Sequence, residues 1–131
     1  MTLQNDNRND LAKLRFQKAK ETFAEIENLV LLCYWRTAAN RLYYACYYAV
    51  SALLIKNGIK AHTHSGVINQ FGLNFITTDV FSQKEGKFFK HLFELRQNGD
   101  YDDWITINKE DIIPRIEPAR DFIDKIEQLI F

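Results

Sequence analysis

The sequence has few of the residues that build disulfide-linked, metal-bound or membrane-spanning proteins. It contains two cysteines, Cys33 and Cys46, which are too few for a disulfide framework and lack the spacing of metal ligands. Both lie among apolar residues, which predicts that both are buried as small hydrophobic groups. No uncharged run approaches the roughly 18 residues of a membrane span, and the amino-terminal residues lack an apolar signal-peptide core. We therefore expect a cytoplasmic protein without a metal or cofactor.

Neither sign of charge is in excess. Seventeen Lys and Arg residues balance 17 Asp and Glu residues, so no overall positive field attracts nucleic acid and any RNA contact must be local. The charge is uneven, because residues 1–60 carry nine basic and five acidic side chains and the remainder carries eight and twelve. The basic first helix could meet phosphate, although a solvated helix face usually has this pattern.

The common catalytic motifs are also absent. There is no glycine-rich phosphate loop, no His-Glu-x-x-His and no Ser-His-Asp order. The length of 131 residues predicts one domain with a core over about residues 10–129, which excludes an active site in an interdomain cleft. With 47% hydrophobic and 26% charged residues, the chain has the composition of a globular protein.

Apolar residues recur at helical spacing along most of the chain, which predicts an all-α, antiparallel up-and-down bundle of four to five helices. A first helix follows Asp10 as its N-cap, and a break is expected near residues 31–34. A second helix runs from about residue 35 to 57 and ends at Gly58. This second helix is apolar or aromatic on nearly every side, so we expect it in the middle of the bundle.

Capping patterns place the later helices. Thr63 or Ser65 could cap a third helix through residue 75, followed by a loop at residues 77–81. Ser82 and Glu85 form a capping-box pattern that begins a fourth helix, which is expected to end near residue 99 before an acidic turn at residues 100–104. Asn108 can cap a last helix, and Pro114 and Pro118 are expected to kink or loosen its first half.

Two groups of polar residues need partners inside this bundle. The first is Asn40 and Arg41, for which an internal hydrogen-bond network is the simplest interpretation. The second surrounds Arg96, which could pair with Asp100 or Asp102 at the end of its helix. Four tyrosines near the first group are interpreted as bundle core and dimer surface, namely Tyr43, Tyr44, Tyr47 and Tyr48.

Three segments resemble the HEPN-domain proteins: RLYYACYYA at residues 41–49, HTHSGV at residues 62–67 and RQNGDY at residues 96–101. Their order and spacing are similar to the small stand-alone prokaryotic branch that has an Arg-x-x-x-Asp-Tyr motif. The resemblance extends over about residues 10–129 and includes ARDFI at residues 119–123. It implies a helical bundle that is usually a homodimer and is often encoded beside a minimal nucleotidyltransferase as a toxin–antitoxin pair.

Many relatives in this family are metal-independent ribonucleases, in which an Arg steadies the phosphate and a His, separated from it by about four to six residues, moves protons. Arg96 matches the family Arg, but no His occupies the positions that the motif allows, residues 101–103. Tyr101, with an unperturbed pKa of about 10, is a poor base at neutral pH. The neighbouring carboxylates, Asp100, Asp102 and Asp103, would repel RNA unless they are neutralised. His64 is the remaining candidate base.

The resemblance gives Tyr101 a second possible role, because partner transferases of some relatives adenylylate a Tyr near the motif. The main functional hypothesis is a nucleotide- or RNA-binding or interaction module that works with a minimal nucleotidyltransferase. The alternatives are an endoribonuclease that uses Arg96 with Tyr101 or His64, and a structural helical adaptor. The predicted binding residues are Arg96, Asn98, Asp100, Tyr101, Asn40 and Arg41.

Overall fold

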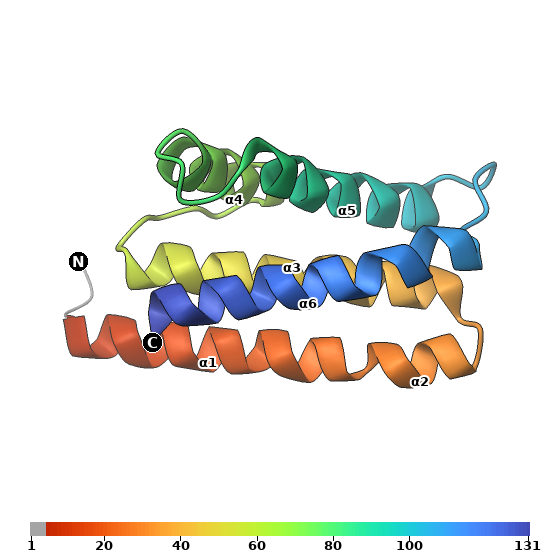
Figure 1. The fold of residues 1–131 in the computed structure, drawn as a ribbon, viewed down its shortest axis with the longest axis horizontal. Helices are drawn as coiled ribbons and strands as arrows, with labels where there is room; N and C mark the ends of the chain where they lie inside the picture. Colours follow the sequence, from red (N-terminus) through yellow and green to blue (C-terminus); the bar gives the residue numbers. More distant parts are fainter. Residues whose placement is uncertain (1–4) are drawn as a thin grey trace.

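The computed structural model describes residues 5–131, and these residues form an all-α bundle without strands. The elements are α1 (Asn5–Ala24), α2 (Ile26–Leu31), α3 (Trp35–Lys56), α4 (His64–Phe71), the π-helical turn η1 (Gly72–Ile76), α5 (Gln83–Tyr101) and α6 (Lys109–Ile130). Figure 1 shows that α2 continues in the direction of α1 and that α3, α5 and α6 run back and forth beside them. If α1 and α2 are counted together, the bundle has five helical segments: α1 with α2, α3, α4, α5 and α6. This confirms the predicted all-α fold class.

Helix α3 is the centre of the bundle, as its sequence predicts. It packs against α1, α5 and α6, and also contacts α2 and α4. Twelve of its 22 residues are buried, and five of these are alanines, which let neighbouring helices approach closely. Cys46 is among the buried residues. The chain therefore carries its Tyr-rich segment, residues 43–48, through the middle of the molecule.

The caps that position the later helices are present. The Thr63 hydroxyl accepts a hydrogen bond from the Gly66 amide at 2.9 Å, which begins α4. At the start of α5, Ser82 Oγ accepts from the Glu85 amide at 3.1 Å, and the Ser82 amide donates to Glu85 Oε1 at 2.9 Å. Asn108 precedes α6 as predicted, and its amide donates to Asp111. These local signals could be read from the sequence because they involve neighbouring residues.

Helix α1 begins before the predicted N-cap, so the assignment of Asp10 to that role was wrong. It starts at Asn5, and its first turns are held by polar contacts with the end of α3. Lys56 Nζ donates to Asn9 Oδ1 at 2.8 Å, and the Arg8 guanidinium lies over Gly58. Hydrophobic periodicity does not reveal such contacts. Gly58 itself has a φ of 70°, which confirms its predicted role as a helix terminator.

A further prediction, about the end of α5, needs correction. Helix α5 extends to Tyr101, so Asp100 belongs to a helix and not to an acidic turn. Gly99 does not end the helix; a Cβ there would lie 3.2 Å from Ile107 Cγ1, so this glycine permits close packing. Helix α6 continues without interruption through Pro114 and Pro118. Both prolines are exposed, so the carbonyl groups they leave unpaired can face water.

The predicted burial of Cys33 was wrong. This residue is exposed in the turn between α2 and α3, where its φ is 57°. Its apolar sequence neighbours Leu32 and Tyr34 are exposed as well, at 59% and 56%. Apolar residues adjacent in sequence do not bury one another when the turn that carries them lies at the end of a bundle. No helix within residues 5–131 has the length and apolar character needed to cross a membrane.

Candidate functional site

Three helices bring polar side chains together beside the Tyr-rich part of α3. Helix α3 contributes three residues, the last turns of α5 contribute two, and α4 contributes its first residue. We call this group the Arg96 cluster; it consists of Asn40, Arg41, Tyr44, His64, Arg96 and Asp100. The cluster therefore combines five residues selected from the sequence, including the candidate base His64, with Tyr44, which was expected only to pack.

Arg96 is the most enclosed charge of the cluster, with 13% of its side chain exposed. Its Nε atom lies 3.0 Å from Asp100 Oδ2, one helical turn away, which confirms the predicted ion pair. This Nε atom is fully buried and the contact lacks hydrogen-bond alignment, so it is a charge attraction. Arg96 Nη2 donates a hydrogen bond to the Tyr44 hydroxyl at 3.1 Å. Asp102, the other predicted partner, accepts from the Trp104 amide instead.

A hydrogen-bond network joins α3 to the end of α5. Asn40 Nδ2 donates to Asp100 Oδ2 at 3.3 Å, and Asn40 Oδ1 accepts from Arg41 Nε and Nη2 at 3.0 and 2.6 Å. This confirms the internal network predicted for Asn40 and Arg41. Arg41 also pairs with Glu25 at 3.6 Å, where the Glu25 side chain is 55% exposed. Such a solvent-exposed pair is weak, so Arg41 is the more available of the two cluster cations.

The Tyr44 ring contacts both guanidinium groups of the cluster. Its centroid lies 5.2 Å from Arg96 Cζ and 5.5 Å from Arg41 Cζ, which are cation–π distances. Its hydroxyl accepts a hydrogen bond from Arg96, so both the ring and the hydroxyl of Tyr44 contact positively charged groups. Tyr44 was expected to belong to the bundle core and dimer surface. A Tyr in a helical core still needs a partner for its hydroxyl, and this requirement could have indicated the contact with Arg96.

His64 lies in an aromatic cage at the start of α4. Its Nδ1 is 2.7 Å from the Tyr43 hydroxyl, and its ring centroid is 4.6 Å from that of Tyr47 and 5.8 Å from that of Tyr44. Tyr43 is fully buried and has no other hydrogen-bond partner in the part of the chain described. Only one arrangement satisfies both groups: the Tyr43 hydroxyl donates to Nδ1, and Nε2 of His64 carries the ring proton.

The protonation states follow from this environment. Burial raises the pKa of the Tyr43 hydroxyl far above its usual value, so this group stays a hydrogen-bond donor. Burial, and then the nearby positive charge of Arg96, lower the pKa of His64 below its ordinary value of about 6.5. His64 is therefore neutral at pH 7 and offers an N–H group at Nε2. In this tautomer it can donate to an anion, whereas the nitrogen that could act as a base is occupied.

The remaining predicted residues lie outside this network. Asn98 is exposed, and no hydrogen bond joins its side chain to the cluster within residues 5–131. Tyr101 is 71% exposed, with its ring centroid 5.5 Å from Arg96 Cζ, so it lies at the edge of the cluster. Among the described residues, no group of three or more His, Cys, Asp or Glu side chains is placed to hold a metal ion.

The fold and site together define a small helical-bundle protein with an enclosed Arg, a neutral His and several tyrosines on facing helices. Comparison with protein families agrees with this description, because the HEPN domain model matches residues 12–129. The chain therefore belongs to the HEPN domain family, as its sequence motifs suggest.

Two related proteins cover most of this chain. A UPF0332 protein of Thermotoga maritima is 36% identical over 114 residues, which are 87% of this chain and 86% of the relative. A protein of Methanocaldococcus jannaschii whose name reads "Putative toxin" is 31% identical over 121 residues, covering 92% of this chain and 82% of that protein. The chain is thus related over most of its length to a protein named as a toxin.

Proposed function

We propose that this protein is the HEPN partner in a toxin–antitoxin-type pair and that its Arg96 cluster binds the phosphate of a nucleotide or RNA. The other member of the pair would be a minimal nucleotidyltransferase. The observation that carries the proposal is the meeting of two guanidinium groups and a neutral His64 around Tyr44. The similarity to a protein named as a toxin supports the wider biological role.

The chemistry of the cluster suits binding of a phosphate. Arg96 is neutralised at Nε by Asp100, so a ligand would meet its outer nitrogens, together with the Nε2–H group of His64. Arg41 supplies a second, more exposed guanidinium, because a phosphate can replace its weak contact with Glu25. Tyr44 places its ring between these donors and the core.

Substitution of Arg41 tests this proposal with little disturbance of the core. In Arg41→Ala, the dissociation constant for a short labelled RNA should rise by roughly 10- to 100-fold, since a hydrogen bond to a charged group contributes about 1.5–3 kcal/mol. The matched control is Arg120→Ala on α6, an Arg that is half exposed and far from the cluster in sequence. Equal affinity of wild type and Arg41→Ala would contradict the proposal.

A metal-independent endoribonuclease is the second candidate, and the position of His64 favours it. The resemblance leads us to expect a His near Arg96, and His64 lies close enough for the Arg96 charge to lower its pKa. In the tautomer described above, neutral His64 can donate a hydrogen bond from Nε2 to the phosphate, but it must first be protonated at Nδ1, in place of the Tyr43 hydrogen bond, before it can give a proton to the leaving 5′-oxygen. The cluster lacks a second group with a pKa near neutrality to accept the proton of the 2′-hydroxyl, which is why binding is the first proposal.

Cleavage of end-labelled RNA in EDTA separates the two functions. A ribonuclease predicts cleavage by wild type that is lost in both Arg96→Ala and His64→Gln, provided that circular dichroism shows both variants folded. Cleavage that persists in both folded variants would indicate a contaminating nuclease. If wild type does not cleave but binds RNA, the binding module is supported, and absence of any nucleotide-dependent rise in melting temperature would support the structural adaptor.

A further inference from the structure

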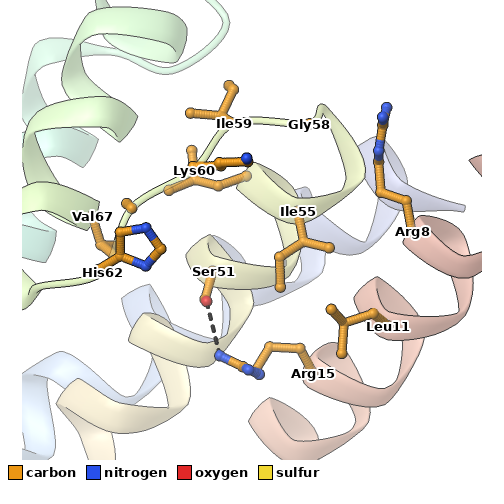
Figure 2. A pocket seen from close by; sticks show the side chains of 12 residues that line it. Arg8, Leu11, Arg15, Ser51, Ile55, Gly58, Ile59, Lys60, His62 and Val67 are labelled. Carbon is orange, nitrogen blue, oxygen red and sulfur yellow. Dashed lines mark hydrogen bonds between the residues drawn. The ribbon is translucent and has the colours of Figure 1, made fainter. Parts of the chain in front are cut away.

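A concave site separate from the Arg96 cluster lies at the end of the molecule where α1 begins and α3 ends. It is a pocket of about 440 Å³ between α1, α3, the segment at residues 58–62 and the start of α4. Figure 2 shows Leu11 and Arg15 on one wall, Ile55 and Ser51 on α3, and Lys60 and His62 on the segment that crosses above them. Its volume is within the range of small-molecule pockets. None of its lining residues belongs to the Arg96 cluster.

Three basic residues of this pocket, Arg15, Lys60 and His62, have no ion pair with a carboxylate among the described residues. Arg15 is half-buried, and its Nη1 donates to the neutral Ser51 hydroxyl at 3.1 Å. Lys60 and His62 are exposed and make no hydrogen bond or ion pair with residues 5–131. No Asp or Glu lines the pocket. Five basic residues elsewhere in the described chain do have a carboxylate partner, namely Lys20, Arg41, Arg96, Arg120 and Lys125.

This arrangement is suited to an anion. Arg15 is a half-buried residue that uses one of its five N–H donors in a hydrogen bond with the described residues, which leaves its other donors available to a ligand. The planar fork of an Arg matches the two oxygens of a carboxylate or phosphate, and Lys60 adds a mobile second charge at the rim. The anion would supply a counter-charge to Arg15 and Lys60.

The apolar part of the lining indicates which kind of organic group would carry the anionic head. It is formed by aliphatic side chains, namely Leu11, Leu54, Ile55, Ile59, Ala61 and Val67. The lining has no Phe, Tyr or Trp on which a base could stack and no Asn or Gln that could read its edge. A nucleotide is therefore a poor match to this surface, and an aliphatic chain is a good one.

We propose that this pocket binds an amphiphilic organic anion, with an aliphatic body against Leu11, Leu54 and Ile55 and a carboxylate or phosphate head at Arg15 and Lys60. A fatty acid and an alkyl phosphate from a lipid share this chemistry. The site is independent of the proposed phosphate site in the Arg96 cluster. The two sites are nevertheless close, because both approach Tyr47. The positive charge of Arg15 favours the ionised form of the Tyr47 hydroxyl, and the Tyr47 ring packs against His64 of the cluster.

The test is titration calorimetry of the intact protein with decanoate and decyl phosphate, both below the concentration at which they form micelles. We expect saturable binding of one or both, and the tighter of the two identifies the source of the head group. Decan-1-ol lacks the charge, and acetate and inorganic phosphate lack the chain, so all three should bind at least tenfold more weakly. Equal binding of decanol, acetate or inorganic phosphate would overturn the proposal, as would tighter binding of adenosine monophosphate.

Two substitutions assign the binding to this pocket. Arg15→Gln keeps a donor for Ser51 but removes the charge, and Lys60→Gln changes an exposed side chain that the fold does not need. Each should weaken decanoate binding by tenfold or more. The control is Lys18→Gln, because Lys18 lies on the same helix but over the ring of Tyr48 and outside the pocket. Unchanged affinity in both folded pocket variants, or equal loss in the control, would contradict the assignment.

Discussion

Tyr101 lies in the last turn of α5 with 71% of its surface exposed, at the edge of the Arg96 cluster. Its hydroxyl is therefore accessible to another protein, while its ring remains 5.5 Å from Cζ of Arg96, the most enclosed charge of the cluster. If the partner is a nucleotidyltransferase, this phenol oxygen can attack the α-phosphorus of ATP. The products would be an adenylyl-tyrosine and pyrophosphate, and the phenol proton would pass to a base of the transferase.

We predict that incubation with the neighbouring nucleotidyltransferase and ATP adds an adenylyl group to Tyr101. Peptide mass spectrometry measures the adduct, and Tyr101→Phe should remove it because the acceptor oxygen is gone. Tyr34→Phe is the matched control, since Tyr34 is also exposed, at 56%, but lies on the α2–α3 turn. An adduct that survives in Tyr101→Phe, or its complete absence from wild type, would rule out this role.

The protonation of His64 makes a prediction about stability and pH. Its pKa is lower in the folded protein than in the unfolded chain, so the unfolded state binds more protons as the pH falls below about 6.5. The free energy of unfolding should therefore decrease on acidification through this range. In His64→Gln this dependence should be smaller, and urea titrations between about pH 7 and 5 measure it. Parallel curves for the two proteins would contradict the assignment.

At the scale of elements, the ends of α5 have different roles. Its beginning is structural: Ser82 and Glu85 form the capping box, and Lys125 of α6 donates to Glu85 at 3.0 Å. Burial alone would raise the pKa of Glu85, but these hydrogen bonds together lower it. Its other end carries Arg96 and Asp100. The capping box and the Lys125 contact thus fix the beginning of α5, and this helix positions Arg96 and Asp100 near its other end.

Removal of the cap should weaken this anchor. In Ser82→Ala the amide of Glu85 loses its acceptor, so the free energy of unfolding should fall by about 1 kcal/mol. Ser65→Ala provides a control, since Ser65 is exposed and contacts the Thr63 hydroxyl at a long 3.4 Å; its effect should be about 0.5 kcal/mol or less. Equal destabilisation of the two variants, measured by urea unfolding, would show that the cap has no special contribution.

Local signals predicted most of the helices, whereas contacts between distant residues determined the site. The stripes and caps of α3, α5 and α6 involve residues a few positions apart, so periodicity identifies them. The bond between Tyr44 and Arg96 spans 52 residues, and that between Tyr43 and His64 spans 21. The sequence indicated Arg96 through a motif, but it could not show that His64 lies beside the same tyrosines.

At the scale of the whole molecule, α3 remains only partly covered. Tyr44, Tyr47 and Tyr48 are half-buried after α1, α5 and α6 have packed, and the Lys18 ammonium lies 4.6 Å from the Tyr48 ring centroid. A surface with several half-buried aromatic side chains is typical of an interface between proteins. The expected homodimer would place a second copy over these tyrosines.

Light scattering after size-exclusion chromatography tests this expectation. We predict a mass of twice 15.4 kDa for wild type and a shift toward the single-chain mass in Tyr48→Ala, because the substitution removes apolar contact area. Tyr34→Ala, at the α2–α3 turn, should leave the mass unchanged. A wild-type protein that is monomeric at all concentrations would contradict the dimer.

The exposed Cys33 has a practical consequence for all of these experiments. It lies on the turn that leads into α3, whereas Cys46, the other thiol of the sequence, is enclosed by the core. A maleimide dye should therefore attach at one position in the folded wild-type protein without any engineered cysteine. Because α3 carries Asn40 and Arg41 shortly after this turn, the dye would report when a partner or an RNA approaches that end of the bundle.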